Sequence, residues 1–284
     1  MGSRSRAEVV RTLSTPRSRP PAPGDVRLSV VVPAYGEAAG IGSTVRRIRE
    51  ELAAVAEDGG LEVVVVDDGS GDGTADAARE AGADQVLAFT ENRGKGAAVR
   101  AGMLAATGRT LVFTDADLSY APAQIVRLLD AVEAGWDVVV GNRFHEQSTT
   151  VVAAGMLRQV GGRGINLATR AVLVGTHPDT QCGLKAFRSD VARVIFGHSR
   201  IDGFAFDVEV IHLVERFGLS LEAVEVEVVN SDRSTVHVAR DALLLLADLV
   251  RIRRGDANGA YDLRPAEREA LGLDAGLGPV APAE

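Results

Sequence analysis

Two aspartates, Asp115 and Asp117, follow the apolar run of TLVFTDADLSY (110–120), with a single alanine between them. Two carboxylates at the end of one strand repel each other, and a nearby positive charge removes that cost. A hard divalent cation such as Mg²⁺ or Mn²⁺ suits the place, because it prefers carboxylate oxygens and shared phosphate oxygens. One carboxylate then reaches the metal while the other holds a ribose hydroxyl or a metal-bound water. A solvated turn would show the same spacing, so the motif alone leaves both interpretations open.

Three other segments carry side chains suited to a nucleotide. VVPAYGE (31–37) offers Tyr35 as a face for a flat base and Glu37 as an acceptor for ribose hydroxyls. VVVVDDGSGDGT (63–74) ends in Asp68, whose carboxylate can accept the N3–H of uracil, and ENRGKG (91–96) places Lys95 between two glycines where it suits a diphosphate. Tight turns that cap helices would also explain these glycines. None of the segments is a P-loop or a G-x-G-x-x-G fingerprint.

The elements that must position these residues alternate along the chain. Short Val-rich runs without polar alternation predict strands buried on both faces, at 28–33, 61–68, 110–115 and 136–141. Helical patterns lie between and after them, at 41–56, 74–81, 95–106 and 122–134, with Ser119 as a possible cap for the last. Such β–α units predict an α/β fold with an open, mostly parallel sheet flanked by helices. Ligands then bind beyond the carboxyl ends of the strands, where PAYGE, DDGS, TDAD and GNR gather.

The second half of the chain is less regular. Helices are predicted at 158–174 and 204–217, and an amphipathic helix at 238–254 that would pack on the domain or lie on a membrane. In 222–229, valines alternate with glutamates, which predicts a strand with one wet face. Asp207 and Glu209 are candidate bases for an alcohol acceptor, or caps and ion-pair partners within the fold.

Composition bounds the function. The net charge of −8 argues against nucleic acid as a partner. The single Cys182 fits a reducing compartment and a packing role. Crossing a membrane needs roughly 20 apolar residues, and no run here approaches that. We expect a disordered basic tail at 1–25, one domain at 26–255 and a loose extension at 256–284, with the protein cytoplasmic and peripheral on the inner face of the cell membrane.

Taken together, VVPAYGE, VVVVDDGSGDGT, NRGKGAAVRAG and FTDADLSYAP resemble, in order and spacing, the family 2 glycosyltransferases with the GT-A fold, over about 27–255. DTQCGLKAFRSDVA (179–192), FAFDVEVI (204–211) and RDALLLLADLVRIR (240–253) are similar to dolichyl-phosphate β-glucosyltransferases, and in part to polyprenyl-phosphate mannose synthases. The resemblance implies an inverting, metal-dependent enzyme that moves glucose from UDP-glucose to a polyprenyl or dolichyl phosphate, using Mg²⁺ or Mn²⁺.

The resemblance also assigns roles to residues. Donor binding falls to Pro33, Ala34, Tyr35, Glu37, Asp68, Lys95, Asp115, Ala116 and Asp117, and the metal to Asp115 and Asp117. Catalytic roles fall to Asp117, Arg143 and Lys185, and the acceptor side comprises Arg143, Arg158, Asp179, Gln181, Asp207, Glu209, Arg233 and Ser234.

Three departures from the family pattern stand out. Gly36 replaces a common asparagine, Ser234-Thr235 replaces a usual Ser-Lys pair with Arg233 just before it, and the membrane span of many relatives is absent.

Other functions stay open at this stage. A mannosyltransferase using GDP-mannose, a transferase acting on a saccharide or small metabolite, and a non-catalytic nucleotide-sugar-binding protein are alternatives. A nucleotidyltransferase would begin with a Gly-rich basic loop, which PAYGE is not.

Overall fold

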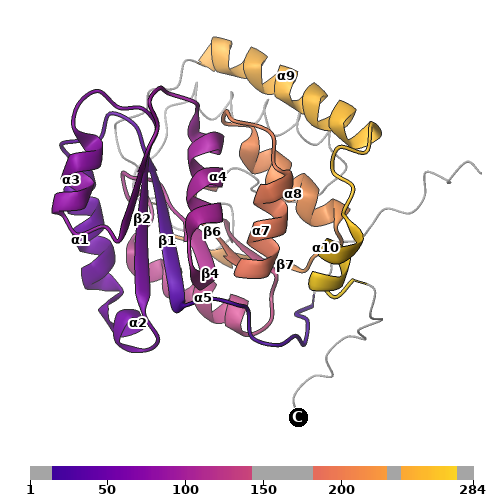
Figure 1. The fold of residues 1–284 in the computed structure, drawn as a ribbon, viewed down its shortest axis with the longest axis horizontal. Helices are drawn as coiled ribbons and strands as arrows, with labels where there is room; N and C mark the ends of the chain where they lie inside the picture. Colours follow the sequence, from indigo (N-terminus) through magenta and orange to yellow (C-terminus); the bar gives the residue numbers. More distant parts are fainter. Residues whose placement is uncertain (1–14, 143–181, 229–237, 274–284) are drawn as a thin grey trace, which may run out of the picture.

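A computed structural model of the protein describes residues 15–142, 182–228 and 238–273 (Figure 1). Its strands are β1 (Val26–Ala34), β2 (Leu61–Asp67), β3 (Gln85–Ala88), β4 (Gly108–Phe113), β5 (Val138–Asn142), β6 (Lys185–Arg188) and β7 (Leu221–Glu225). The helices are α1 (Ile41–Glu51), α2 (Ala53–Glu57), α3 (Thr74–Glu80), α4 (Lys95–Ala105), α5 (Ile125–Glu133), α7 (Ser189–His198), α8 (Phe206–Arg216), α9 (Val238–Ala257) and α10 (Pro265–Ala270), with a 3₁₀ turn, η1 (Pro122–Gln124), before α5.

The strands form one sheet in the order β3-β2-β1-β4-β6-β5-β7. Neighbouring strands are parallel except at β6, which is antiparallel to both β4 and β5. The predicted open, mostly parallel α/β sheet is therefore confirmed. We call the edge at which the parallel strands end the carboxyl edge, and the edge at which they begin the amino edge.

Helices cover both faces of the sheet, which explains the continuous valine runs (Figure 1). In β1, Val30 and Val32 point into a core with α1 and α5, whereas Val31 points into the opposite core with α4, α7 and α8. Both faces of the strand are buried, so no polar alternation is left in its sequence. The strand predicted at 222–229 appears as β7 over Leu221–Glu225, and Val226, the first residue after it, is buried.

Sequence patterns missed four elements, namely β3, β6, α7 and α10, the last within the extension expected to be loose. Edge strand β3 has four residues that are half-buried or exposed, and β6 is equally short, so neither leaves a clear apolar run. Helix α7 directly follows β6. The expected cap Ser119 is not one: Ala121 precedes η1 and makes no side-chain cap, while Ser119 binds Asp117 instead. The helix expected at 158–174 lies outside the described residues.

The division into tail, domain and extension stays a prediction, but the structure describes contacts at both ends. In the segment 15–25, the carbonyl oxygens of Pro20 and Pro23 accept hydrogen bonds from Arg188 and Ser189. Beyond α9, Tyr261 is buried and its hydroxyl donates to Glu209 at 2.7 Å. The first contacts join the segment 15–25 to the end of β6 and the start of α7, and the second joins the residues around Tyr261 to α8. Within the described residues, no helix combines the length and apolar character needed to span a bilayer.

Candidate functional site

The carboxyl edge gathers side chains that are far apart in the sequence. β1, β2, β4 and β5 all end there, each within or just before one of the polar motifs. Because β6 runs in the opposite direction, its first residue, Lys185, lies at the same edge, paired with Phe113 of β4 and Val140 of β5. The antiparallel strand thus adds a cation that a purely parallel sheet would not place there.

The loop after β1 is held by the loop after β2. The amides of Gly36 and Glu37 donate to the hydroxyls of Ser70 and Thr74, each at 2.9 Å. Pro33 and Ala34 end β1, and the following Tyr35 is 58% exposed, so its ring is available to a base. Gly36 has a φ of +69°, a conformation that glycine and asparagine tolerate best, which explains why the family's asparagine can be exchanged for glycine here.

Asp68 is buried and organises the loop that leads to Lys95. Its carboxylate accepts hydrogen bonds from the Arg93 amide at 2.8 Å, the Gly94 amide at 2.9 Å and the Asn92 side chain at 3.0 Å. The described structure therefore shows Asp68 positioning the start of α4, whereas the predicted contact with uracil remains a prediction.

Lys95 and Asp115 form an ion pair across the carboxyl edge, with the ammonium 2.5 Å from Oδ1. Both side chains are partly accessible, at 24% and 29%. A solvated turn does not by itself describe Asp115, because its carboxylate is paired with the Lys95 ammonium.

The turn at 115–118 is fixed from several sides. The Ala116 carbonyl accepts a hydrogen bond from the Thr44 hydroxyl of α1 at 2.6 Å, and Asp117 Oδ1 accepts the Ser119 amide and hydroxyl at 3.0 and 2.8 Å. Leu118 has a φ of +47°, although it is not glycine, and it is buried. This left-handed residue costs about 1–2 kcal/mol, and such strain is maintained only where surrounding contacts require it.

A second ion pair lies beneath the first. Lys185 is fully buried, and its ammonium donates to Asp207 Oδ1 at 2.5 Å and to the Cys182 carbonyl at 2.6 Å. The same ammonium lies 5.4 Å from the centre of the Phe113 ring. Asp207, in the first turn of α8, is 5% exposed. Lys185 and Asp207 thus lie together near the carboxyl edge, while the catalytic role of Lys185 and the acceptor-side role of Asp207 stay predictions. Cys182 is buried.

The two pairs influence each other electrostatically. Burial lowers the pKa of Lys95, but the carboxylates of Asp115 and Asp207 outweigh it and raise that pKa above its usual value. Burial raises the pKa of Asp207, and the ammoniums of Lys185 and Lys95 offset this only in part. Lys95 thus stays protonated, as a site for an anionic leaving group requires.

Glu209 occupies a different environment, and the structure gives no support to its predicted acceptor-side role. The side chain is fully buried and accepts hydrogen bonds from the Ser199 hydroxyl, the Arg200 and Ile201 amides and the Tyr261 hydroxyl, at 2.7–3.0 Å. These donors occupy both carboxylate oxygens. Glu209 therefore joins α8 to neighbouring loops, as the structural alternative proposed.

Several predicted residues cannot be placed. Those outside the described residues are Arg143, Arg158, Asp179, Gln181, Arg233 and Ser234.

One residue that the sequence did not single out is Gly183, between Cys182 and Lys185. A Cβ at this position would lie 2.2 Å from Asp115 Oδ2. Only glycine leaves room for that carboxylate in its present position. The residue lies inside the DTQCG motif, but sequence alone could not show which side chain it faces.

The carboxylates present suit a divalent metal. Mg²⁺ is commonly held by one or two carboxylates together with substrate phosphates, and Asp115 and Asp117 are two such groups on one turn. Among the described residues, no group of three or more His, Cys, Asp or Glu side chains could hold a metal by itself. A metal here would therefore need oxygens from the substrate.

Comparisons with known proteins agree with this geometry. Residues 29–196 match the model of glycosyl transferase family 2. The chain is 34% identical over 224 residues to the dolichyl-phosphate beta-glucosyltransferase of Drosophila melanogaster, covering 74% of this chain and 69% of the relative. It is 30% identical over 260 residues to the enzyme of that name from Saccharomyces cerevisiae, covering 84% and 77%.

Among solved structures, glucosyl-3-phosphoglycerate synthase from Mycobacterium tuberculosis in complex with phosphoglyceric acid has a TM-score of 0.61 at 23% identity, with 80% of each chain covered. A structure of that synthase with Mn²⁺, UDP and glucosyl-3-phosphoglycerate has a TM-score of 0.60 at 22% identity, again covering 80% of each chain. These likenesses show a shared GT-A-like fold. With the family model matching more than half of its length, the chain belongs to glycosyl transferase family 2.

Proposed function

We propose that this glycosyltransferase moves glucose from UDP-glucose to a polyprenyl phosphate, with inversion at the anomeric carbon. The names of the Drosophila and yeast relatives support both the glucosyl donor and the lipid phosphate acceptor. The observation that carries the proposal is the state of the carboxylates at the site: Lys95 and Lys185 bind Asp115 and Asp207, and Glu209 is saturated with donors.

These engaged carboxylates favour an acceptor that needs no base. An alcohol must lose a proton during attack, and a carboxylate within about 3 Å would have to take it. A phosphate monoester is already largely dianionic near pH 7, because its second pKa is about 6. Its oxygen can attack the anomeric carbon directly, as the bond from that carbon to the diphosphate breaks and UDP leaves.

The protein's own groups then align the reactants and stabilise the leaving diphosphate. Tyr35 and Glu37 hold the nucleoside, and the Lys95 ammonium accompanies the negative charge that develops on the diphosphate. Asp115 and Asp117 would hold Mg²⁺ or Mn²⁺, which when bound would supply Lewis-acid stabilisation of the same charge. Lys185 pairs with Asp207 and holds its carboxyl group in place beside the Lys95–Asp115 pair.

Binding at a membrane surface would bring the enzyme to a lipid acceptor. Leu246 and Val250 lie one turn apart on α9 and are 45% and 46% exposed, and Phe204 is 57% exposed. The helix continues with Arg251, Arg253 and Arg254, which suit anionic headgroups. These features support our proposal that the protein binds peripherally to a membrane. Cosedimentation with anionic vesicles should fall for Leu246→Glu with Val250→Glu, and not for Leu104→Glu, a control on α4 whose residue is 40% exposed.

A transfer assay tests the function. The full chain is incubated with radiolabelled UDP-glucose, Mn²⁺ and polyprenyl phosphate, and we expect a butanol-extractable product that mild acid cleaves. Parallel arms supply GDP-mannose as donor, or phosphoglycerate and a saccharide as acceptors. Success only in one of those arms would replace the proposal, and UDP binding without any transfer would favour a non-catalytic protein.

Asp117→Ala should reduce turnover more than 100-fold, the order expected when a group that stabilises the transition state is lost. Asp76→Ala provides a matched control, since Asp76 is an exposed aspartate on α3 whose side chain pairs with Arg79. Circular dichroism checks that both variants are folded. Wild-type turnover in Asp117→Ala would remove this residue from the mechanism.

A further inference from the structure

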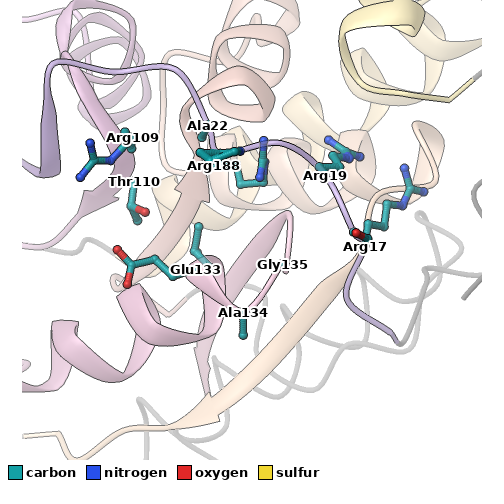
Figure 2. Close-up of a pocket in the computed structure, with 12 residues that line it drawn as sticks. Arg17, Arg19, Ala22, Arg109, Thr110, Glu133, Ala134, Gly135 and Arg188 are labelled. Atoms are coloured by element: carbon teal, nitrogen blue, oxygen red, sulfur yellow. The ribbon is translucent and has the colours of Figure 1, made fainter. Parts of the chain in front are cut away.

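A pocket of about 370 Å³ lies at the amino edge of the sheet, away from the site described above. One wall is the segment 17–22, and the other comprises the start of β4 and the end of α5 (Figure 2). Its lining includes four arginines, namely Arg17, Arg19, Arg109 and Arg188. This volume falls in the range of small-molecule sites, about 300–1,000 Å³.

Positive charge dominates the lining. The one acidic side chain among the lining residues is Glu133, and Arg27 already binds it through two hydrogen bonds of 2.7 Å. Asp190 engages Arg188 at 3.0 and 3.1 Å. The remaining arginines therefore carry more charge than the nearby carboxylates neutralise.

Arg19 has hydrogen-bonding capacity that the described protein does not use. Its side chain is only 5% exposed, and Nη2 lies 3.1 Å from Asp137. Nε and Nη1 are buried and have no partner among the described residues. A buried donor without an acceptor costs about 1–3 kcal/mol, and more when it is charged. The Asp137 carboxylate is shared between Arg19 and the Ser220 amide, which donates a hydrogen bond to Oδ2 at 2.8 Å.

We propose that this pocket binds a small phosphate-bearing anion: Arg19 lines the pocket, and a turn of its side chain on binding would present the unpartnered Nε and Nη1 to the anion, with Arg17 and Arg109 adding charge. Guanidinium groups match phosphate oxygens in geometry and form strong charge-assisted hydrogen bonds with them. Thr110 in the pocket and Asp115 at the carboxyl edge are five residues apart along one extended segment, or about 17 Å at 3.3 Å per residue. The anion would therefore not contact the sugar donor.

Phosphate binding by the full chain tests the proposal. Equilibrium dialysis with radiolabelled inorganic phosphate is done in EDTA, so that no metal helps phosphate to bind at the carboxyl edge. We expect saturable binding to one site, weakened at least tenfold by Arg19→Gln and by Arg109→Gln. Arg109→Gln is included because removal of the buried Arg19 leaves Asp137 with one cation fewer and can unfold the protein. Arg79→Gln, an exposed arginine on α3 paired with Asp76, should bind like wild type.

Two outcomes would overturn the proposal. One is the absence of saturable binding in the wild-type protein. The other is binding that Arg19→Gln and Arg109→Gln leave unchanged but Lys95→Gln weakens, which would place the phosphate at the carboxyl edge. Neither outcome bears on the transfer of glucose, because that assay depends on other residues and on the metal.

Discussion

Gly183→Ala should disable the site without unfolding the protein. The added Cβ would stand 2.2 Å from Asp115 Oδ2 and 2.9 Å from its Cγ. Ordinary contact begins at 3.4 Å, so the carboxylate or the backbone must move by about 1.2 Å. Asp115 makes its ion pair with Lys95 at 2.5 Å, and that movement would break or redirect it.

The expected loss follows from the displacement. Misplacing a group by about 1 Å at a reacting centre can cost 10²-fold in rate. We therefore expect turnover with UDP-glucose and polyprenyl phosphate to fall about 100-fold, measured as nucleotide released. Manganese affinity, measured by titration calorimetry in the presence of UDP, should fall with it, since Asp115 is one of the two proposed ligands.

Gly197→Ala in α7 is the matched control. A Cβ there meets nothing within 4 Å, so the same substitution should leave turnover unchanged and not destabilise the helix. Thermal unfolding of both variants verifies their folding. If Gly183→Ala turned over at the wild-type rate with normal manganese affinity, then the position of Asp115 would not matter, and the reasoning would fail.

Two further predictions concern stability. Lys185→Met leaves Asp207 buried without its cation, which should lower the free energy of unfolding, measured in urea, by about 3–5 kcal/mol. The double variant Lys185→Met with Asp207→Leu should recover much of that loss. Equal stability of the single and double variants would contradict this prediction. The Arg264 side chain lowers the pKa of Glu267 from its ordinary 4.5 to about 2, with His198 assisting at 3.0 Å. A carboxyl group whose pKa is lower in the folded than in the unfolded state stabilises the fold at pH values above its unfolded-state pKa. That stabilisation is lost as the pH falls toward 2, the pKa in the folded state. The difference in unfolding free energy between wild type and Glu267→Gln should therefore shrink between about pH 5.5 and 2.5; a difference independent of pH would contradict the assignment.

The strands that the sequence pattern predicts correctly are those with long apolar runs. β1, β2, β4 and β5 form where valine-rich segments predicted them, because strands buried on both faces leave a continuous apolar signal. Edge strand β3 and antiparallel β6 are four residues long, and their apolar residues are too few to form such a signal. Pairing with neighbours, rather than local sequence, makes them strands.

The candidate site divides in a similar way. The motifs around Tyr35, Asp68, Lys95 and Asp115 could be located from the sequence because each follows a predicted strand, and parallel strands deliver their ends to one edge. Glu209 shows the limit of that reasoning. It lies two residues from Asp207 on α8, about 200° around the helix, and so faces different neighbours.

The sequence by itself determined the alternation of strands and helices, the family and the edge of the sheet at which charged motifs gather, since these depend on local periodicity and motif order. Tertiary structure alone decided which charges meet. Lys95 reaches Asp115, Lys185 reaches Asp207 from a reversed strand, and Gly183 leaves space for a carboxylate 68 positions earlier in the chain. Contacts of this kind depend on distance in space, and no short-range pattern in the sequence encodes that distance.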